Sequence, residues 1–232
     1  MSNKKIPYNE KQYDSFAGEF KLAQQKFYSK KNESREVLYS LLSLSLRGKK
    51  LLDVGCGFGK DLLYYKENGA DVFGIDISKK MIQSAKEATK MENLSMQDYS
   101  KTNFKSDFFD VVVSRYALQY KKDLKSTFTE LHRILKPGGV FIFLVSHPLL
   151  GYVARKEKNY NKQEVVSIPL FNGQIITKEP THTLTDYLSD FMLSNFTLEF
   201  LVEGKKTENK FPGQNVPDFI CFKFKKNKSS RN

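Results

Sequence analysis

The sequence contains few of the features that stabilise a secreted domain or anchor a chain in a membrane. Only two of its 232 residues are cysteines, Cys56 and Cys221. No disulfide framework is therefore indicated, and a reducing compartment fits. The longest apolar run, Val140 to Val145, is far below the roughly 20 residues that cross a bilayer. Residues 1–7 lack the apolar core of a signal peptide. We expect a cytoplasmic protein with no membrane contact.

Acidic residues are in the minority. The 38 Lys and Arg residues against 26 Asp and Glu give a net charge of +12. Such an excess is compatible with a nucleic-acid partner, because phosphates are bound by Lys and Arg. The lysines are scattered, however, and charged runs are more often solvated faces. We therefore expect no nucleic-acid partner. A length of 232 residues with 40% hydrophobic content predicts one α/β domain over residues 1–232.

The most informative stretch is Leu51-Leu52-Asp53-Val54-Gly55-Cys56-Gly57-Phe58-Gly59-Lys60-Asp61. Its pattern predicts a short buried strand, a glycine-rich turn and the first turn of a helix. Glycines there let bare backbone approach a ligand, and the N–H groups at the helix start favour negatively charged groups.

An acidic residue follows at the distance expected of a nucleotide-binding unit. The next predicted strand, Asp71 to Asp76, ends on an acid seventeen residues after Gly59, where a carboxylate accepts both ribose hydroxyls. The glycine spacing then distinguishes between ligands. A dinucleotide fingerprint places Gly or Ala three residues after Gly57, but Lys60 stands there. The Gly-x-Gly-x-Gly form instead favours S-adenosylmethionine over NAD.

At these motifs the sequence resembles the class I S-adenosylmethionine-dependent methyltransferases, in particular the group that acts on small molecules. A second match is Leu131 to Gly139, similar to the family's Leu-x-Arg-x-Leu-Lys-Pro-Gly-Gly turn, in which Pro stops a helix before the next strand. The resemblance implies a Rossmann-like α/β fold: a seven-stranded, mostly parallel sheet with helices on both faces and an antiparallel C-terminal strand. It also implies an N-terminal helical cap over residues 1–34.

The resemblance assigns the cofactor site residue by residue. An acid at the end of the third strand, predicted over Asn93 to Tyr99, corresponds to the family's adenine contact, which would be Asp98. Tyr13 lies in a segment similar to the family's Tyr-Asp-x-x-Ala opening. The residues expected at S-adenosylmethionine, or its product S-adenosylhomocysteine, are Tyr13, Asp53, Gly55, Cys56, Gly57, Gly59, Asp76, Ile77, Met81, Gln97, Asp98, Tyr99, Ser114, Arg115 and Tyr116. No metal is predicted.

The acceptor side is predicted from the strands that end at the same edge. The β-branched run Phe108 to Ser114 reads as a central parallel strand, and ligands bind outside the carboxyl ends of such strands. Residues 149–180 have poor periodicity and interspersed aromatics, and so long a connection is usually functional. We expect a substrate lid over 149–180, followed by one helix that begins near Thr181 and turns Leu188, Phe191 and Met192 inward. The residues predicted to face the acceptor are Tyr116, Gln119, Tyr120 and Tyr152.

Two histidines are candidates for a general base, His147 and His182. A base helps when the acceptor is a hydroxyl, an amine or an acidic carbon. For each of them a polar or capping role in the pocket is an equally good interpretation. Related enzymes often carry His where this chain has Gln119, which removes a titratable group at that position.

The leading functional hypothesis is transfer of a methyl group from S-adenosylmethionine to an oxygen, nitrogen or carbon nucleophile of a small molecule. An RNA or protein methyltransferase with the same cofactor is the alternative, supported by the net charge alone. A non-catalytic cofactor-binding protein is the second alternative, and the intact glycine loop argues against it. We expect a monomer or a homodimer.

Overall fold

The computed structural model describes residues 8, 12–27, 32–42, 46–204 and 215–228. Much of the predicted 1–34 cap, most of the polar loop after residue 203 and the end of the Lys-rich tail lie outside the described residues. In the part that is described, no helix is long and apolar enough to cross a membrane.

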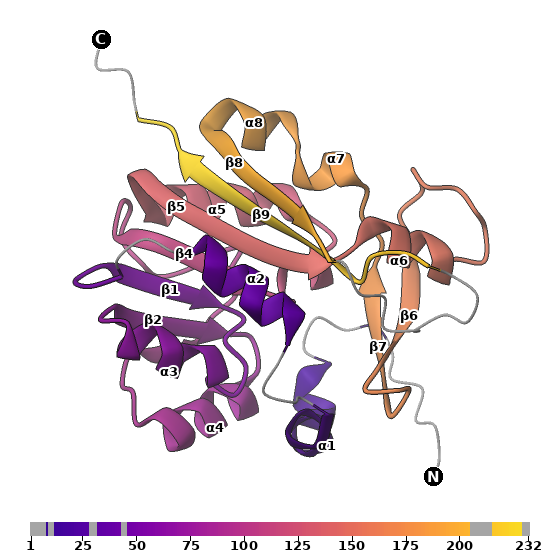
Figure 1. Ribbon diagram of the computed structural model, residues 1–232, viewed down its shortest axis with the longest axis horizontal. Helices are drawn as coiled ribbons and strands as arrows, with labels where there is room; N and C mark the ends of the chain where they lie inside the picture. The colour runs from indigo at the N-terminus through magenta and orange to yellow at the C-terminus, as the bar shows by residue number, and fades with distance from the viewer. Residues whose placement is uncertain (1–7, 9–11, 28–31, 43–45, 205–214, 229–232) are drawn as a thin grey trace.

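The sheet has seven strands in the order β3-β2-β1-β4-β5-β9-β8 (Figure 1). β9 runs antiparallel to both of its neighbours, and all other pairs are parallel. The predicted fold class is confirmed. The strands are β1 (Lys50–Val54), β2 (Asp71–Asp76), β3 (Leu94–Met96), β4 (Phe109–Arg115), β5 (Leu135–Ser146), β8 (Phe196–Glu203) and β9 (Phe219–Lys226).

Helices cover both faces of the sheet because alternate strand residues point to opposite sides. Leu52 and Val112 belong to one buried cluster and their neighbours Leu51 and Val111 to the other. The first cluster includes side chains of α5 (Leu124–Ile134), α7 (Leu184–Tyr187) and α8 (Asp190–Asn195). The second includes side chains of α2 (Glu33–Leu41), α3 (Lys60–Glu67) and α4 (Lys79–Thr89).

The segment predicted as an irregular lid, 149–180, is more regular than expected. It contains most of α6 (Pro148–Ala154) and a separate two-stranded antiparallel sheet of β6 (Val165–Leu170) and β7 (Ile175–Pro180). Val166 and Ile168 are buried with Leu150 of α6, the alternation of a half-buried strand. The tip, Phe171 to Gly173, has three successive positive φ angles of 52°, 53° and 81°, and such backbone angles close a tight turn.

Three other local predictions need correction. The helix expected after Thr181 is two short helices, α7 and α8, because Leu188 and Ser189 leave helical geometry between them. The third strand is three residues long, Leu94–Met96. Pro137 does not precede β5 but lies within it, since the strand already begins at Leu135 with a register shift against β4.

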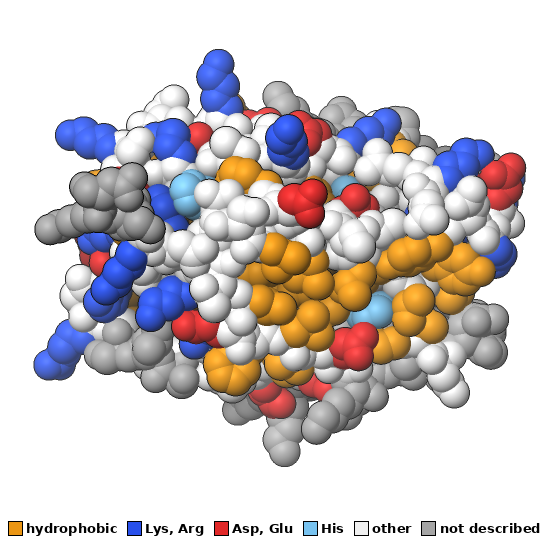
Figure 2. Space-filling view, turned by 90° about the horizontal axis from the view of Figure 1, so that it is seen from above, with side chains coloured by type: hydrophobic (Ala, Val, Ile, Leu, Met, Phe, Trp, Pro, Cys, Tyr) orange, Lys and Arg blue, Asp and Glu red, His pale blue; other side chains and the backbone are white. Residues whose placement is uncertain are grey.

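The N-terminal helix α1 (Tyr13–Phe27) lies at one edge of the molecule, beside α4 and close to the β6–β7 hairpin (Figure 1). It bends at Phe16, whose φ and ψ are −130° and 21°. On the opposite edge of the sheet, β8 exposes most of its length, including Leu198, Phe200 and Leu201. Figure 2 shows hydrophobic side chains gathered into a band on the face seen from above, where α6, α7, α8 and β8 lie.

Candidate active site

The glycine loop after β1 is held open by its backbone. Gly55 has a φ of 75°, and a Cβ there would lie 2.2 Å from Cβ of Ala117, so no side chain fits. Gly57 has a φ of 53°. A Cβ at Gly57 would meet nothing within 4 Å, so this turn presents bare backbone to open space. These are the conditions under which only glycine fits and a ligand can approach the chain closely.

Asp76, at the carboxyl end of β2, is fixed against this loop. Its carboxylate accepts hydrogen bonds from the backbone N–H of Gly57 at 3.0 Å and of Ser78 at 2.9 Å. Burial raises the pKa of Asp76 to about 6, because its effect outweighs that of the two backbone donors, which lower the pKa. The acid and the loop are therefore one preformed unit.

Asp53 lies at the end of β1, 4% exposed. Burial raises the pKa of its carboxyl well above the ordinary range, and the nearby Asp61 adds to this effect. Burial likewise raises the pKa of the Cys56 thiol, and Cys56 belongs to one of the two large buried clusters.

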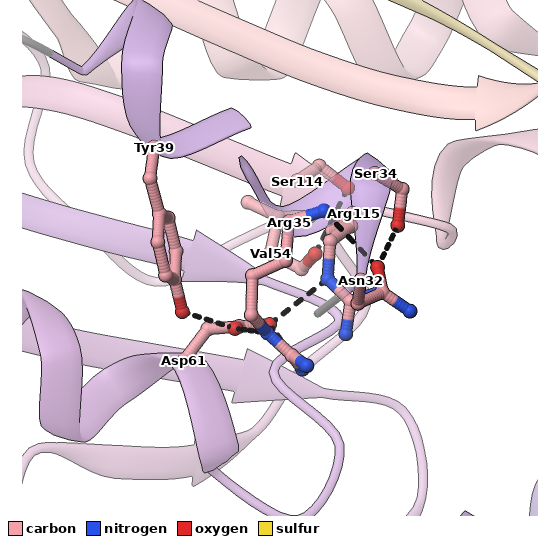
Figure 3. A network of polar contacts seen from close by, with 8 residues as sticks. All are labelled: Asn32, Ser34, Arg35, Tyr39, Val54, Asp61, Ser114 and Arg115. Carbon is pink, nitrogen blue, oxygen red and sulfur yellow. Dashed lines mark hydrogen bonds and ion pairs between the residues drawn. The ribbon is translucent and has the colours of Figure 1, made fainter. Parts of the chain in front are cut away.

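A buried ion-pair network supports the loop from the other side (Figure 3). Asp61, in the first turn of α3, accepts hydrogen bonds from Nε of Arg35, from Nε of Arg115 at 2.9 Å and from the Tyr39 hydroxyl at 2.5 Å. Burial raises the pKa of Asp61, but the two guanidinium groups outweigh it and hold the pKa well below its usual value. Arg115 thus pairs with Asp61, and its predicted contact with the cofactor stays a prediction.

Sequence analysis did not identify Arg35 and Asp61 as site residues, although an acid in the first turn of a helix is a recognisable signal. Ser114, another predicted cofactor residue, is fully buried and donates its hydroxyl to the Val54 carbonyl at 2.9 Å. Its side chain links β4 to β1.

The three residues after β3 organise their own loop. Asp98 accepts from Lys121 Nζ at 2.7 Å and from the Ser100 N–H at 2.8 Å. Gln97 bonds to Ser95 and to the Asn103 N–H, and the Tyr99 hydroxyl donates to the Ala117 carbonyl at 2.9 Å. The side-chain groups of all three make bonds that shape this loop, and a contact with the adenine remains a prediction.

The start of α1 ties the predicted cofactor region to the acceptor side. The Tyr13 hydroxyl shares a hydrogen bond of 2.6 Å with that of Tyr120, in the short 3-10 helix η1 (Leu118–Tyr120). Asp14 accepts from the Ser78 hydroxyl at the start of α4. Gln12 bonds both backbone groups of Lys178 on β7. Sequence reasoning found Tyr13 but neither Gln12 nor Asp14.

The two candidate bases differ in what surrounds them. His147 is the N-cap of α6: its Nδ1 accepts from the Leu149 N–H at 3.1 Å, and Nε2 lies 2.8 Å from a carboxylate oxygen of Glu203. Both ring nitrogens are therefore in use. His182 is 4% exposed, and its Nε2 has no hydrogen-bond partner among the described residues. Burial lowers the pKa of His182, against the carboxylate of Asp186, which raises it.

Of the residues predicted to face the acceptor, Gln119 and Tyr120 are buried in η1, beside β7 of the predicted lid. Tyr116 follows β4 with a φ of 56°. Tyr152 instead lies on α6 near Tyr160, with ring centroids 6.3 Å apart. The structure thus joins Tyr13 to Tyr120 and brings Gln119 close to His182, and it places Tyr152 against the lid's own loop.

Comparisons with known proteins identify a methyltransferase domain in this chain. Residues 52–143 match the sequence model of a methyltransferase domain. The chain is 31% identical over 115 residues to malonyl-[acyl-carrier protein] O-methyltransferase of Salmonella typhimurium. The matched region covers 50% of this chain and 45% of that enzyme. It is 35% identical over 140 residues to an uncharacterised protein of Haemophilus influenzae, and this match covers 54% of this chain and 55% of that protein. The chain thus spans about half the length of these relatives.

Solved structures agree on the fold. A putative S-adenosylmethionine-dependent methyltransferase of Listeria monocytogenes superposes with a TM-score of 0.71 at 23% identity, covering 84% of this chain and 99% of that one. A methyltransferase of Mesorhizobium loti gives 0.69 at 24% identity, covering 84% and 98%. Residues 52–143 therefore carry a methyltransferase domain, and the fold of the chain is that of S-adenosylmethionine-dependent methyltransferases. The family and the cofactor predicted from the sequence are confirmed.

The residues of this methyltransferase fit that cofactor. Gly57 offers backbone with room beside it, and Asp76 presents a fixed carboxylate to a ribose. None of the hydrogen bonds between described residues includes the buried Asp53 carboxyl, which remains able to take a donor. We expect the cofactor to lie along this edge, over Gly55 to Gly59 and Asp76.

Proposed function

We propose that the protein transfers a methyl group from S-adenosylmethionine to a small-molecule acceptor held between the sheet edge and the lid. The observation that carries the proposal is the unit formed by Gly57 and Asp76, whose backbone and carboxylate are hydrogen-bonded at 3.0 Å. The cofactor supplies an electrophilic methyl group on a sulfonium. The chain's own task is to align a nucleophile with it and to exclude water.

Asp76 would hold the ribose hydroxyls, since a carboxylate fixed by two backbone donors retains lone pairs for two more. Gly57 would give the cofactor close access to the backbone, and Asp53 would receive a donor of the cofactor. Tyr13, bonded to Tyr120, would close α1 over the same space.

The packing of the lid favours a small molecule as the acceptor. The hairpin β6–β7 packs beside η1, and Phe171 at its tip contacts Phe20 of α1, with ring centroids 5.2 Å apart. Two elements far apart in the sequence thereby meet over the sheet edge, an arrangement that suits enclosure of a compact substrate.

The observations restrict the identity of the acceptor's nucleophilic atom less than they restrict the size of the acceptor. The relatives matched here include malonyl-[acyl-carrier protein] O-methyltransferases and a phosphoethanolamine N-methyltransferase of Arabidopsis thaliana. They support an oxygen or a nitrogen nucleophile for this chain. A macromolecular acceptor has two observations in its favour: the net charge of +12, and the names of the malonyl-[acyl-carrier protein] O-methyltransferases, whose substrate is carried on a protein.

Where the acceptor must lose a proton, we assign the base to His182 rather than His147. A base needs a free lone pair within reach of the acceptor. Nε2 of His182 has no partner among the described residues, and the lowered pKa keeps the ring neutral at pH 7. His147 uses both nitrogens to cap α6 and to meet Glu203.

The proposal is tested by screening metabolite extracts for release of S-adenosylhomocysteine, with mass spectrometry of any ligand that co-purifies. We expect product release with a fraction of small metabolites and none with the Asp76→Ala variant. Release with RNA or protein fractions alone would shift the assignment to the macromolecular alternative. A protein that binds the cofactor but methylates nothing in either fraction would support the non-catalytic one.

A further inference from the structure

The chain at the start of α1 holds the β6–β7 hairpin. Gln12, just before α1, is 2% exposed. Its side-chain amide bonds both backbone groups of Lys178 on β7: Nε2 donates to the carbonyl oxygen at 2.7 Å, and Oε1 accepts from the N–H at 3.0 Å. Neighbouring strands of a sheet are joined by the same donor and acceptor groups. Gln12 therefore binds the hairpin as a neighbouring strand would, although it belongs to the segment before α1.

Two residues later, the same segment is fixed to the cofactor side of the site. The carboxylate of Asp14 accepts a hydrogen bond from the Ser78 hydroxyl, and Lys80 Nζ donates to the Asp14 backbone carbonyl at 2.8 Å. Ser78 also donates its N–H at 2.9 Å to Asp76, the acid expected at the ribose. A series of hydrogen bonds therefore leads from the expected ribose site to Asp14, two residues from the glutamine that holds the hairpin.

The short link between Gln12 and Asp14 is itself held in place. The backbone carbonyl of Gln12 accepts from the Ser15 N–H at 3.0 Å and from the Ser15 hydroxyl at 2.6 Å. Tyr13, between the two, shares a hydrogen bond with Tyr120 and packs edge-on against its ring. Because these bonds restrain the backbone of the whole link, a displacement of Asp14 also displaces Gln12.

The charges at this junction give the cofactor a way to act on it. Ser78 bonds to two carboxylates at once, Asp76 through its N–H and Asp14 through its hydroxyl. Burial is the main cause of the raised pKa of Asp76, and the charge of Asp14 adds to it, so the two acids repel each other when both are ionised. Ribose hydroxyls that donate to Asp76 would offset this repulsion, because a donor stabilises the ionised form. Asp14 would then be held more firmly against the start of α4.

We propose that Gln12 is a positioning residue through which an occupied cofactor site holds the β6–β7 hairpin against α1 and η1. This inference rests on the proposed function and adds an order of binding, cofactor first and acceptor second. The hairpin lies beside η1, so the wall that β7 gives to the acceptor side is firmly in place only when the cofactor is bound. Because such coupling is reciprocal, the docked hairpin strengthens cofactor binding by the same factor.

The test compares the whole protein with and without saturating S-adenosylhomocysteine, and measures amide hydrogen exchange of residues 165–180 by nuclear magnetic resonance. Exchange reports how often the hairpin opens. In the unaltered protein we expect S-adenosylhomocysteine to slow this exchange at least fivefold. In Gln12→Ala the free protein should exchange faster, and S-adenosylhomocysteine should slow exchange less than twofold. The affinity of this variant for S-adenosylhomocysteine should fall by no more than the factor lost at the hairpin.

A purely structural role of Gln12 gives a different result. Gln12→Ala would then speed exchange equally with and without S-adenosylhomocysteine, and an unchanged ratio of the two rates overturns the inference. So does an unaltered protein whose hairpin does not respond to saturating S-adenosylhomocysteine. The matched control is Gln25→Ala, which shortens an exposed glutamine of α1 and should keep the wild-type ratio. Failure of the unaltered protein to bind S-adenosylhomocysteine would instead contradict the proposed function.

A second variant tests the step that depends on charge. Asp14→Asn keeps an oxygen that can accept from the Ser78 hydroxyl but removes the charge that opposes Asp76. The hairpin of the free variant should then exchange nearly as slowly as that of the wild-type complex, and S-adenosylhomocysteine should slow it less than twofold further. If Gln12→Ala does not fold, this variant decides: a response to S-adenosylhomocysteine as large as that of the wild type contradicts the inference.

Discussion

The two halves of the site satisfy their polar groups differently. On the cofactor side, Asp76 is held by two backbone donors and Asp61 by two arginines and a tyrosine. On the lid side, Gln119, Arg155 and His182 each keep a buried polar atom without a partner in the described chain. The first half is organised before any ligand arrives, whereas the second has hydrogen-bonding capacity in reserve.

This difference indicates a division of labour. A preorganised cofactor site binds the same molecule in every turnover and needs no adjustment. The acceptor side includes a separate two-stranded sheet connected to the rest through α6 and a few contacts with η1 and α1, and such peripheral elements open more readily. If the division holds, changes in the lid should affect turnover and changes at Asp76 should affect cofactor affinity.

The largest effect is expected from replacing lid residues 156–179 by a short Gly/Ser linker. Turnover should fall below detection because water enters and Gln119 and His182 lose their cover. The affinity for S-adenosylhomocysteine, measured by calorimetry, should change less than about tenfold, the residual loss arising from the contacts of Gln12 and Phe20 with the hairpin. Cofactor affinity that disappears together with turnover would refute the division.

The two histidines sharpen the comparison within the lid half. His182→Ala should lower the rate by roughly 10²–10⁴-fold and remove an inflection of the pH–rate profile. That inflection should lie below the ordinary value of 6.5, because burial lowers the pKa of His182 and only the neutral ring accepts a proton. His147→Asn, which keeps a capping oxygen, should leave the profile in place. Near wild-type turnover in both variants would mean that neither histidine is the base and that catalysis rests on alignment alone.

Asp76→Ala tests the cofactor half. Loss of two charge-assisted hydrogen bonds to the ribose should cost about 2–4 kcal/mol of affinity for S-adenosylhomocysteine. The control is Asp71→Ala at the opposite end of the same strand, which removes a half-exposed ion pair with Lys50. That change should leave the affinity unaltered. Equal dissociation constants for the two variants would mean that the ribose is bound elsewhere.

The smallest effect is the pH dependence of cofactor binding. The raised pKa of Asp76, about 6 against an ordinary 3.8, means that its contribution to the stability of the free protein is complete below pH 3.8 and is lost as the pH rises through 6. Ribose hydroxyls favour the ionised form, so binding should strengthen about tenfold between pH 5 and pH 7. Titrations across this range should show the change in the wild type and a flatter profile in Asp76→Asn.

The sequence signals of the cofactor half are local. Gly55, Gly57 and Asp76 carry backbone and spacing requirements that can be read along the chain, and the structure joins Gly57 to Asp76. Ser114 and Arg115 were assigned by position at a strand end. Their side chains bond to Val54 and Asp61, which the sequence did not predict, and their contacts with the cofactor stay predictions. Only the three-dimensional packing of α2 and α3 shows where such a side chain is needed.

The lid was predicted as a segment but not as a structure. Its strand alternation, with Val166 and Ile168 inward, covers only a few residues, and the hairpin signal lies in Asn172-Gly173 at its tip. The burial of Arg155 could not be predicted from the sequence, because an arginine is normally exposed.

The measurement that tests the account most directly is a parallel calorimetric titration of the whole protein with S-adenosylhomocysteine and with NAD. The geometry of Gly55, Gly57 and Asp76, with Lys60 at the third dinucleotide position, predicts saturable binding of S-adenosylhomocysteine and none of NAD. Tighter binding of NAD would contradict the cofactor site described here and the methyl transfer proposed from it.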